Sequence, residues 1–450
     1  MSYTDRVISQ ISQNHPEQAP FIQAVSEVYK TISPLLNSDP IYEKYAILER
    51  LAVPDRQVLF RVTWSDDNGK IHVNNGYRVQ FSQTIGPYKG GLRFHPSVNL
   101  GIIKFLGFEQ VFKNSLTTLS LGGGKGGSDF DPKGKSDAEV MRFCQSFMNE
   151  LYRHIGANTD VPAGDIGVGA REVGYLFGQY KRLQDRFDGV LTGKGVHFGG
   201  SLARKEATGF GSVYFAENML NDRGESLEGK ICTVTGSGNV ATYTIQKLLD
   251  LGAKPVTCSD SKGFIYDKNG IDIELLKQIK EIKRASLEEY AKEKKDAIYT
   301  PIKDYKNGEN AVFSIPCFAT FPSATQNELN LNDAKNLLKN GCKCVCEGAN
   351  MPSTLEAIDL FLEAKIAFGP AKAANAGGVA TSGLEMAQNA SMQIWDFDTV
   401  EGKLKQIMKS IFDNAKNTAQ EFKDPSNLVM GANIAGFKKV ADAMISQGLV

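Results

Sequence analysis

The chain has 450 residues, enough for two or three domains of ordinary size. Lysine plus arginine and aspartate plus glutamate both number 51, so no net positive field exists to attract nucleic acid or an anionic membrane. Hydrophobic residues make up 42% and charged residues 23%, a balance that excludes a largely disordered chain.

The first residues contain no apolar stretch of signal-peptide length, and no segment approaches the ~18 apolar residues of a membrane span. The seven cysteines include no CxxC pair. Cys342, Cys344 and Cys346 alternate and therefore share one face of a strand, where we expect small buried side chains and no metal site. These features predict a reduced, cytoplasmic protein.

The first part of the chain predicts a helix followed by strands. Apolar residues recur at helical spacing over residues 21–35. Residues 57–64 and 76–82 alternate in polarity and are joined by the turn sequence DDNGK, which predicts two strands. Residues 100–116 are expected to form a helix.

After about residue 200, short apolar runs alternate with helical stretches, which is typical of a doubly wound parallel sheet. A helix is expected over 240–251, a solvated helix over the Lys- and Glu-rich residues 279–295, and further helices from Gly383 onward. The chain is thus expected to be an α/β protein with two lobes around a cleft. The expected strands are residues 231–235, 255–259, 311–315, 343–346 and 366–368.

A glycine-rich turn follows the first of these strands. Gly236-Ser237-Gly238-Asn239-Val240-Ala241 has the form GxGxxA between a strand and a helix. The glycines allow a tight turn and close backbone approach, and the helix N-terminus offers free N–H groups to a pyrophosphate. This context predicts a dinucleotide-binding site.

The residues after the next strand bear on the choice of dinucleotide. Asp260 lies 22 residues after Gly238, where an acid accepts ribose hydroxyls and favours NAD. Ser261, Lys262 and Lys283 instead offer donors and cations for the 2′-phosphate of NADP, although such lysines could equally be surface charge. The residues alone leave NAD and NADP open.

Three lysines in the first part of the chain have unusual surroundings. They are Lys89 in GPYKGGLRFHP, Lys113 in GFEQVFKNSL and Lys125 in LSLGGGKGGSDFDP. Gln110 shares a helix face with Lys113. The flanking glycines suggest a backbone pressed against a ligand, and confinement near other cations lowers the pKa of a lysine toward the range useful for proton transfer. Two cationic anchors and a third, catalytic amine predict a small dicarboxylate substrate.

Two further residues are candidates for this site. Asp165 in VPAGDIGVG is an ordinary turn residue unless it faces Lys125, in which case the two groups would divide proton transfer between them. Ser382 could donate to a substrate carboxylate. Alternatively, it caps a helix N-terminus and Glu385 completes the capping box.

Seven motifs run through nearly the whole chain in a fixed order: GPYKGGLRFHP, LSLGGGKGGSDFDP, VPAGDIGVG, RKEATGFG, GSGNVA, CEGANMP and NAGGVATSGLEM. In these motifs the chain resembles the short, hexameric glutamate dehydrogenases of the Glu/Leu/Phe/Val dehydrogenase superfamily. The resemblance implies reversible oxidative deamination of L-glutamate to 2-oxoglutarate and ammonium by a homohexamer. It also implies a substrate-binding and oligomerisation domain (residues 1–200 and 424–450) and a dinucleotide-binding domain (residues 201–423).

The resemblance implies a role for each candidate residue. Lys125 would be the catalytic lysine, and Asp165 the carboxylate that works with it and deprotonates incoming ammonium. The implied substrate-binding residues are Lys89 and Ser382 at the side-chain carboxylate, Gln110 and Lys113 at the α-carboxylate, and the Gly164 carbonyl at the amino group.

The run SDSKG after the second strand is similar to the NADP-preferring members of the family, which favours NADP over NAD. No metal is implied. The cofactor-binding residues expected from the turn and the resemblance are Thr208, Gly236, Ser237, Gly238, Asn239, Val240, Asp260, Ser261, Lys262, Lys283, Asn350 and Asn375.

Two departures from the family pattern stand out. The run IPCFATFPSATQNEL is longer than the usual PCATQNEL, which predicts a longer loop near the cofactor at residues 317–324, and Lys205 stands where proline is usual. The alternatives are a related dehydrogenase of leucine, valine or phenylalanine, which would need no cation for the side chain, and a sensor without activity, which would need neither Lys125 nor Asp165.

Overall fold

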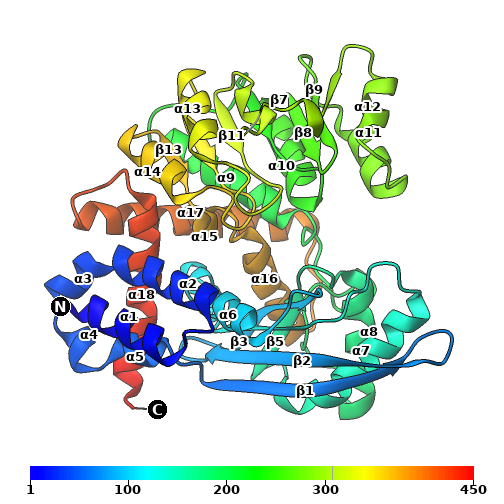
Figure 1. The fold of residues 1–450 in the computed structure, drawn as a ribbon, viewed down its shortest axis with the longest axis vertical. Coiled ribbons are helices and arrows are strands. Elements are labelled where there is room, and N and C mark those ends of the chain that lie inside the picture. The colour runs from blue at the N-terminus through cyan, green and yellow to red at the C-terminus, as the bar shows by residue number, and fades with distance from the viewer. Residues whose placement is uncertain (307, 450) are drawn as a thin grey trace. The chain divides into compact units, whose positions relative to one another are not determined.

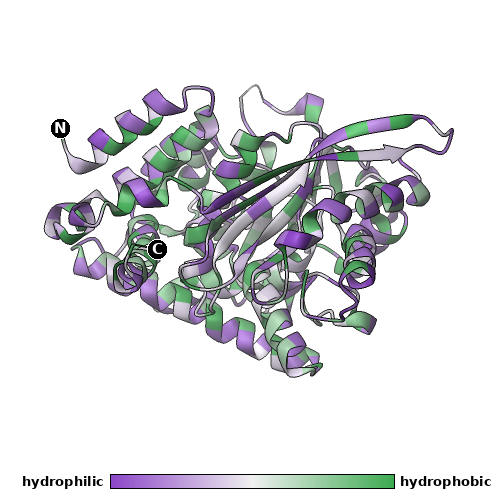
Figure 2. Cartoon of the chain, turned by 90° about the horizontal axis from the view of Figure 1, so that it is seen from below, coloured by the Kyte–Doolittle hydropathy of each residue, from purple (hydrophilic) through white to green (hydrophobic). Residues whose placement is uncertain are grey.

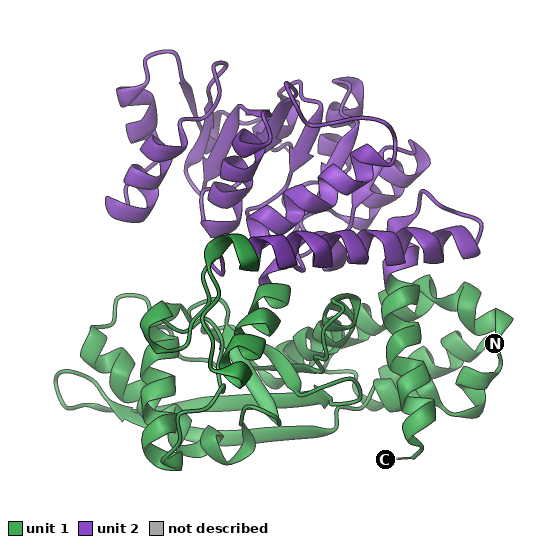
Figure 3. Cartoon of the chain, turned by 180° about the vertical axis from the view of Figure 1, so that it is seen from behind, with its two compact units in different colours: residues 1–202, 379–400, 433–450 green, residues 203–378, 401–432 purple. Residues whose placement is uncertain are grey.

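The computed structural model describes residues 1–306 and 308–449, which divide into two compact units (Figure 3). Unit 1 comprises Met1–Leu202, Val379–Val400 and Asn433–Val450, and unit 2 comprises Ala203–Gly378 and Glu401–Ala432. The segment Val379–Val400 therefore packs with unit 1, although it lies within the range that we assigned to the dinucleotide-binding domain.

Unit 1 is built on a mixed five-stranded sheet with the order β1-β2-β4-β3-β5 (Figure 1). β1 pairs antiparallel with β2 and β2 with β4, whereas β4–β3 and β3–β5 are parallel. The predicted strands over 57–64 and 76–82 lie within β1 and β2. The strand bounds are β1 (Arg56–Ser65), β2 (Ile71–Ser82), β3 (Tyr88–Phe94), β4 (Gly123–Ser128) and β5 (Asp160–Gly164).

Helix α6 packs against β2 and β4, and α7 packs against β1 and α8. The predicted helix over residues 100–116 is confirmed as α6; the Asn99 side chain caps it by accepting from the Ile102 N–H at 3.0 Å. The helices of unit 1 are α1 (Tyr3–Asn14), α2 (Ala19–Thr31), α3 (Ser33–Ser38), α4 (Ile41–Lys44), α5 (Ile47–Leu51), α6 (Leu100–Leu116), α7 (Asp137–Leu151), α8 (Ala170–Gln184) and the greater parts of α16 (Gly377–Ser391) and α18 (Leu428–Gln447).

Aromatic side chains fill the core between this sheet and α7. The rings of Phe130 and Phe143 stack with centroids 3.8 Å apart, and Phe94 and Trp64 meet Phe143 edge-on. In contrast, the β1–β2 hairpin carries hydrophobic stretches (Figure 2), and Leu59, Ile71 and Val73 of these two strands are more than half exposed.

Glycines in β4 make room for a buried arginine. Arg78 on β2 reaches Asp160 on β5, donating from Nε to Oδ2 at 2.8 Å and from Nη2 to Oδ1, and both side chains are fully buried. A Cβ on Gly124 would lie 3.2 Å from Nη2 of Arg78, and one on Gly126 would lie 3.0 Å from its Cδ. Side chains alternate along a strand, so Lys125 points to the opposite face. The glycines beside Lys125 thus accommodate Arg78.

Unit 2 contains a parallel sheet with the order β13-β12-β11-β6-β7 and a three-stranded antiparallel sheet with the order β10-β9-β8 (Figure 1). The predicted α/β class with a parallel sheet is confirmed. The strands are β6 (Ile231–Val234), β7 (Lys254–Pro255), β8 (Thr257–Asp260), β9 (Gly263–Tyr266), β10 (Ile298–Pro301), β11 (Ala319–Phe321), β12 (Cys344–Cys346) and β13 (Ala367–Gly369).

The helices of unit 2 surround these sheets, and none of the helices among the described residues is long and apolar enough to cross a membrane. They are α9 (Ala207–Asn221), α10 (Asn239–Asp250), α11 (Ile273–Lys277), α12 (Glu288–Glu293), α13 (Leu331–Lys339), α14 (Leu355–Glu363), α15 (Ala371–Ala374) and the greater part of α17 (Phe397–Glu421).

Two predicted elements of unit 2 are wrong. Residues 311–315 do not form a strand, because Ala311–Ser314 is a 3₁₀ helix that begins at the Asn310 side-chain cap, and the strand comes later, as β11. The residues expected as a longer loop at 317–324 therefore include a buried strand of the sheet. Residues 279–295 do not form one helix: a π-helical turn over Gln278–Ile282 ends before α12, and Ile279, Leu287 and Tyr290 are buried.

All seven cysteines are buried, as expected for Cys342, Cys344 and Cys346. Cys144 lies on α7 in unit 1, and the other six lie in unit 2.

Replacing Gly90 on β3 by alanine should destabilise unit 1 by about 3 kcal/mol, because the new Cβ would lie 1.8 Å from the Gly124 carbonyl oxygen. The control is Gly178→Ala on α8, where no atom lies within 4 Å and alanine should stabilise by about 0.5–1 kcal/mol. Urea denaturation followed by tryptophan fluorescence measures both, since the two tryptophans, Trp64 and Trp395, lie in unit 1. Equal midpoints for the two variants would contradict this close strand packing.

Candidate active site

Lys125 and Asp165 form an ion pair in unit 1, with Nζ 3.1 Å from Oδ2. Lys125 lies on β4 and is 7% exposed, and Asp165 directly follows β5. The chain then turns sharply: the Val168 N–H donates to the Asp165 carbonyl at 2.9 Å, and Gly167 has a φ of +72°, which favours glycine. Asp165 therefore faces Lys125, the condition under which a catalytic role was expected for it.

Arg93, which the sequence analysis missed, shares this carboxylate and donates from Nε to Oδ2 of Asp165 at 2.9 Å. Burial is the main cause of the lowered pKa of Lys125, and the charge of Arg93 adds to it. Burial alone would raise the pKa of Asp165, but Lys125 and Arg93 together hold it below its usual value. Strand alternation was an available signal, because Lys89, Gly91 and Arg93 fall on one face of β3.

Asn114 on α6 links Gln110 to Lys89 through hydrogen bonds. The fully buried Lys89 donates from Nζ to Thr192 Oγ1 at 2.8 Å. Asn114 donates from Nδ2 to the Lys89 carbonyl at 3.0 Å and accepts from Gln110 Nε2 at 2.6 Å. Lys113, next to Asn114 on the same helix, is partly buried. Asn114 and Thr192 were not predicted.

The backbone of Gly164 lies close to Lys125. A Cβ on Gly91 would lie 2.8 Å from the Gly164 carbonyl oxygen and 3.3 Å from Lys125 Nζ. The absence of a side chain at Gly91 therefore lets this carbonyl and this amine border the same small space.

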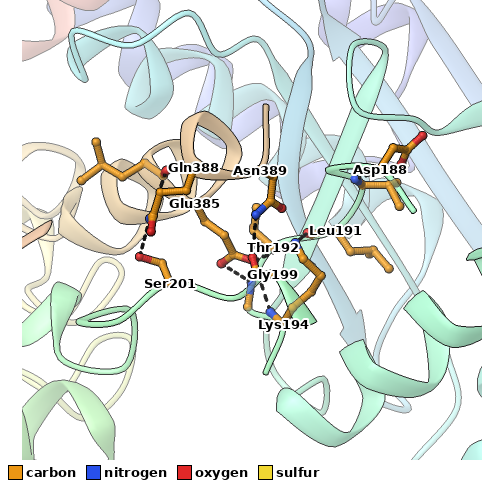
Figure 4. Close-up of polar contacts among 12 residues, drawn as sticks. Asp188, Leu191, Thr192, Lys194, Gly199, Ser201, Glu385, Gln388 and Asn389 are labelled. Carbon is orange, nitrogen blue, oxygen red and sulfur yellow. Dashed lines mark hydrogen bonds and ion pairs between the residues drawn. The ribbon is translucent and has the colours of Figure 1, made fainter. Parts of the chain in front are cut away.

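Ser382 is buried inside α16, which begins at Gly377, so the alternative that it caps a helix is wrong. One turn later, Glu385 accepts from Lys194 Nζ at 2.8 Å (Figure 4), and these side chains are only 0% and 1% exposed. Thr192 lies two residues before Lys194. This buried pair therefore ties the segment that receives the Lys89 amine to the helix that carries Ser382.

Two more side chains of α16 hold the same region of the chain. Gln388 Nε2 donates to Ser201 Oγ at 2.8 Å, and Asn389 Nδ2 donates to the Gly199 carbonyl at 2.7 Å (Figure 4).

In unit 2, the predicted glycine-rich turn connects β6 to α10. Gly236 has a φ of +86°, and a Cβ there would lie 2.9 Å from the Ser323 carbonyl oxygen. Gly238 precedes the first turn of α10 and has open space around it. Such an uncovered helix N-terminus suits a phosphate. Of the other predicted turn residues, Ser237 is buried, Asn239 is exposed, and Val240 lies against Gly348.

Asp260 lies beside this turn. The Gly236 N–H donates to Ser259 Oγ at 2.7 Å, and the Ser259 N–H donates to the Gly236 carbonyl at 3.0 Å. Ser261 and Lys262, which follow Asp260, are exposed. Lys283 is exposed too, with Nζ 3.8 Å from Glu293.

Two asparagines predicted to bind the cofactor lie together. Asn375 Nδ2 donates to Asn350 Oδ1 at 2.8 Å and to the Ala349 carbonyl at 3.1 Å. The buried Oδ1 of Asn375 has no hydrogen-bond partner among the described residues, so an acceptor is available for a ligand N–H. Thr208 lies in the first turn of α9, where its Oγ1 would lie 2.5 Å from a Cβ on Gly378.

Lys205, one of the departures from the family pattern, pairs with Glu281 at 2.6 Å and lies over the Tyr243 ring. Within the described part of the chain, no group of three His, Cys, Asp or Glu side chains could hold a metal ion.

Comparison with known proteins identifies the family. Residues 54–182 match the model of the Glu/Leu/Phe/Val dehydrogenase dimerisation domain, and residues 199–448 match that of Glutamate/Leucine/Phenylalanine/Valine dehydrogenase. The chain belongs to this family. The resemblance drawn from the seven motifs is thereby confirmed.

Several relatives are similar over their full length. An NADP-specific glutamate dehydrogenase of Helicobacter pylori is 68% identical over 99% of this chain and 100% of its own. An NAD(P)-specific glutamate dehydrogenase of Xylanibacter ruminicola is 58% identical over 98% and 99%. The crystal structure of Plasmodium falciparum glutamate dehydrogenase has 52% identity and a TM-score of 0.96, covering 99% of this chain and 95% of that one.

Replacing Glu385 by glutamine should destabilise unit 1 by about 3–5 kcal/mol, because the buried Lys194 loses its counter-charge. The matched control is Glu43→Gln, whose partner Arg6 is half exposed and whose loss should cost at most about 1 kcal/mol. Tryptophan-monitored urea denaturation compares the two variants. A similar decrease in the free energy of unfolding in both variants would show that burial does not strengthen the Lys194–Glu385 pair.

Proposed function

We propose that this chain catalyses the reversible oxidative deamination of L-glutamate to 2-oxoglutarate and ammonium, with hydride transfer to NADP. The Lys125–Asp165 pair carries the proposal, because it combines a buried amine of lowered pKa with a fixed carboxylate. Relatives named NADP-specific glutamate dehydrogenase, at 53–68% identity over almost the full chain, support both the substrate and the cofactor.

The substrate is held at its two carboxylates. Lys89 and Ser382 bind the side-chain carboxylate, and Lys113 and Gln110 bind the α-carboxylate. Charge-assisted hydrogen bonds from two lysines at separate positions favour a dicarboxylate over leucine or valine. The Gly164 carbonyl accepts from the amino group of glutamate.

Lys125 is the group that moves the proton. The burial that lowers its pKa favours the neutral amine, so in deamination, once the hydride has left the α-carbon, Lys125 accepts a proton from the water that adds to that carbon. Asp165, paired with two cations, stays ionised and holds the ammonium product by charge. In the aminating direction, Asp165 keeps the role that the resemblance implies and takes the proton from the incoming ammonium.

The residues of unit 2 fit NADP. The turn from Gly236 to Val240 suits the pyrophosphate, Ser261 and Lys262 offer donors for the 2′-phosphate, and Asn375 Oδ1 offers an acceptor to the carboxamide. NADP supplies the acceptor for the hydride when it is bound.

A homohexamer in the cytoplasm is part of the proposal. A dimerisation-domain model matches residues 54–182, and the exposed apolar residues Leu59, Ile71 and Val73 on β1 and β2 favour contact with another copy. Sedimentation equilibrium gives the number of subunits directly.

The direct test is a spectrophotometric assay of the purified protein. Glutamate should reduce NADP faster than NAD, and leucine should react with a kcat/KM about 10⁴-fold lower, because a site built for a carboxylate leaves its charges unpaired beside an apolar side chain. Faster turnover of leucine, or no reduction of either dinucleotide, would overturn the proposal.

Lys125→Met should lower kcat by about 10²–10⁴-fold, since the proton acceptor is removed. NADPH binding, followed by its fluorescence, should be retained. Lys104→Met is the matched control: Lys104 is also buried, its pKa is lowered to about 8 by burial, and its amine lies 4.0 Å from the centroid of the Phe21 ring on α2. An equal loss of turnover in both variants would contradict a chemical role for Lys125.

Arg93→Gln should shift the acidic limb of the pH profile for deamination upward by about one unit. The positive charge of Arg93 helps to lower the pKa of Lys125; without it the amine stays protonated, and inactive, to a higher pH. Arg61→Gln, at an exposed position on β1, is the control and should keep the wild-type profile. A downward shift in Arg93→Gln would show that another group titrates.

A further inference from the structure

Asp260 occupies a position that normally excludes NADP. It ends β8 beside the glycine-rich turn, where a free carboxylate accepts the ribose hydroxyls of NAD and repels a 2′-phosphate. The proposed preference for NADP therefore requires that this charge be compensated.

All the described contacts of the Asp260 carboxylate are with donors of the protein. Oδ2 lies 3.1 Å from Lys280 Nζ and accepts from the Leu287 N–H at 3.3 Å, and Oδ1 accepts from the Lys262 N–H at 2.9 Å. Burial alone would raise the pKa of Asp260, but the Lys262 N–H and Lys280 hold it below its usual value. Asp260 is thus an anion whose partners come from the chain itself.

The local fold fixes Lys280 in this position. It lies in the π-helical turn Gln278–Ile282, and Nζ also donates to the Ala285 carbonyl at 3.0 Å. The Ala285 N–H donates back to the Ile279 carbonyl at 2.9 Å, and Arg284 has a φ of +52°. The chain therefore folds over Lys280 and brings the Leu287 N–H to the same carboxylate. The Lys280 and Asp260 side chains are only 20% and 15% exposed.

We propose that Lys280 is a positioning residue that sets cofactor preference: it neutralises Asp260 and keeps its oxygens turned away from a ribose hydroxyl. The neutral pair then tolerates the 2′-phosphate of NADP, while NAD loses the acceptor on which it would depend. This role deepens the proposed function and rests on it, since it concerns the dinucleotide of that reaction.

The test is fluorescence titration of the full-length protein with NADPH and with NADH, which needs no turnover. Lys280→Gln should weaken NADPH binding about ten-fold, because the anionic Asp260 then faces the phosphate, and should strengthen NADH binding. Lys277→Gln is the control: this neighbouring lysine pairs with Glu274 and Gln246 instead, so both Kd values should stay unchanged.

The double variant Lys280→Gln/Asp260→Asn separates neutralisation from other roles. Removal of both charges should return NADPH binding to near the wild-type Kd, which loss of a structural contact would not do. Failure of the second substitution to rescue, or equal weakening of NADPH and NADH by the first, would overturn the proposal. A wild-type protein that binds neither dinucleotide would instead overturn the proposed function.

Discussion

A guanidinium that spans several strands organises unit 1. Arg78 reaches from β2 to Asp160 on β5 and donates to the Gly90 carbonyl on β3 at 3.1 Å. A buried charge pair of this kind is tolerated only where its geometry and hydrogen bonds are nearly complete, which forces close registry among the strands. The glycines on either side of Lys125 are a consequence, since a side chain there would occupy the space of Arg78. The structural pair and the reactive amine thus use opposite faces of one strand.

The sequence predicted elements whose signal is local. Helix α6 was predicted with its observed bounds, because its apolar spacing and its length are unambiguous. The strand expected at 311–315 failed because a short apolar run does not distinguish a buried turn from a buried strand. The prediction of one helix over 279–295 failed because the segment folds back to contact Asp260. A tertiary contact of this kind cannot be predicted from the local sequence pattern.

Some residues of the candidate site could likewise be predicted from local sequence, and others could not. Lys89, Lys125 and Asp165 could be selected because glycine-rich motifs mark them in the sequence, and Lys113 because it shares a helix face with Gln110. Supporting contacts between distant parts of the chain could not, since a contact such as Lys194–Glu385 joins residues 191 positions apart. Lys280 was missed for a related reason: its significance comes only from Asp260, with which it shares no sequence motif.

The burial of every cysteine has a practical consequence. A thiol that is closed to solvent reacts with an alkylating reagent only when its surroundings open, so its rate of modification measures that opening. Cys144 is the single thiol of unit 1, and the remaining six belong to unit 2. Peptide mass spectrometry after timed alkylation would therefore measure the local unfolding of each unit separately, with the native cysteines as probes.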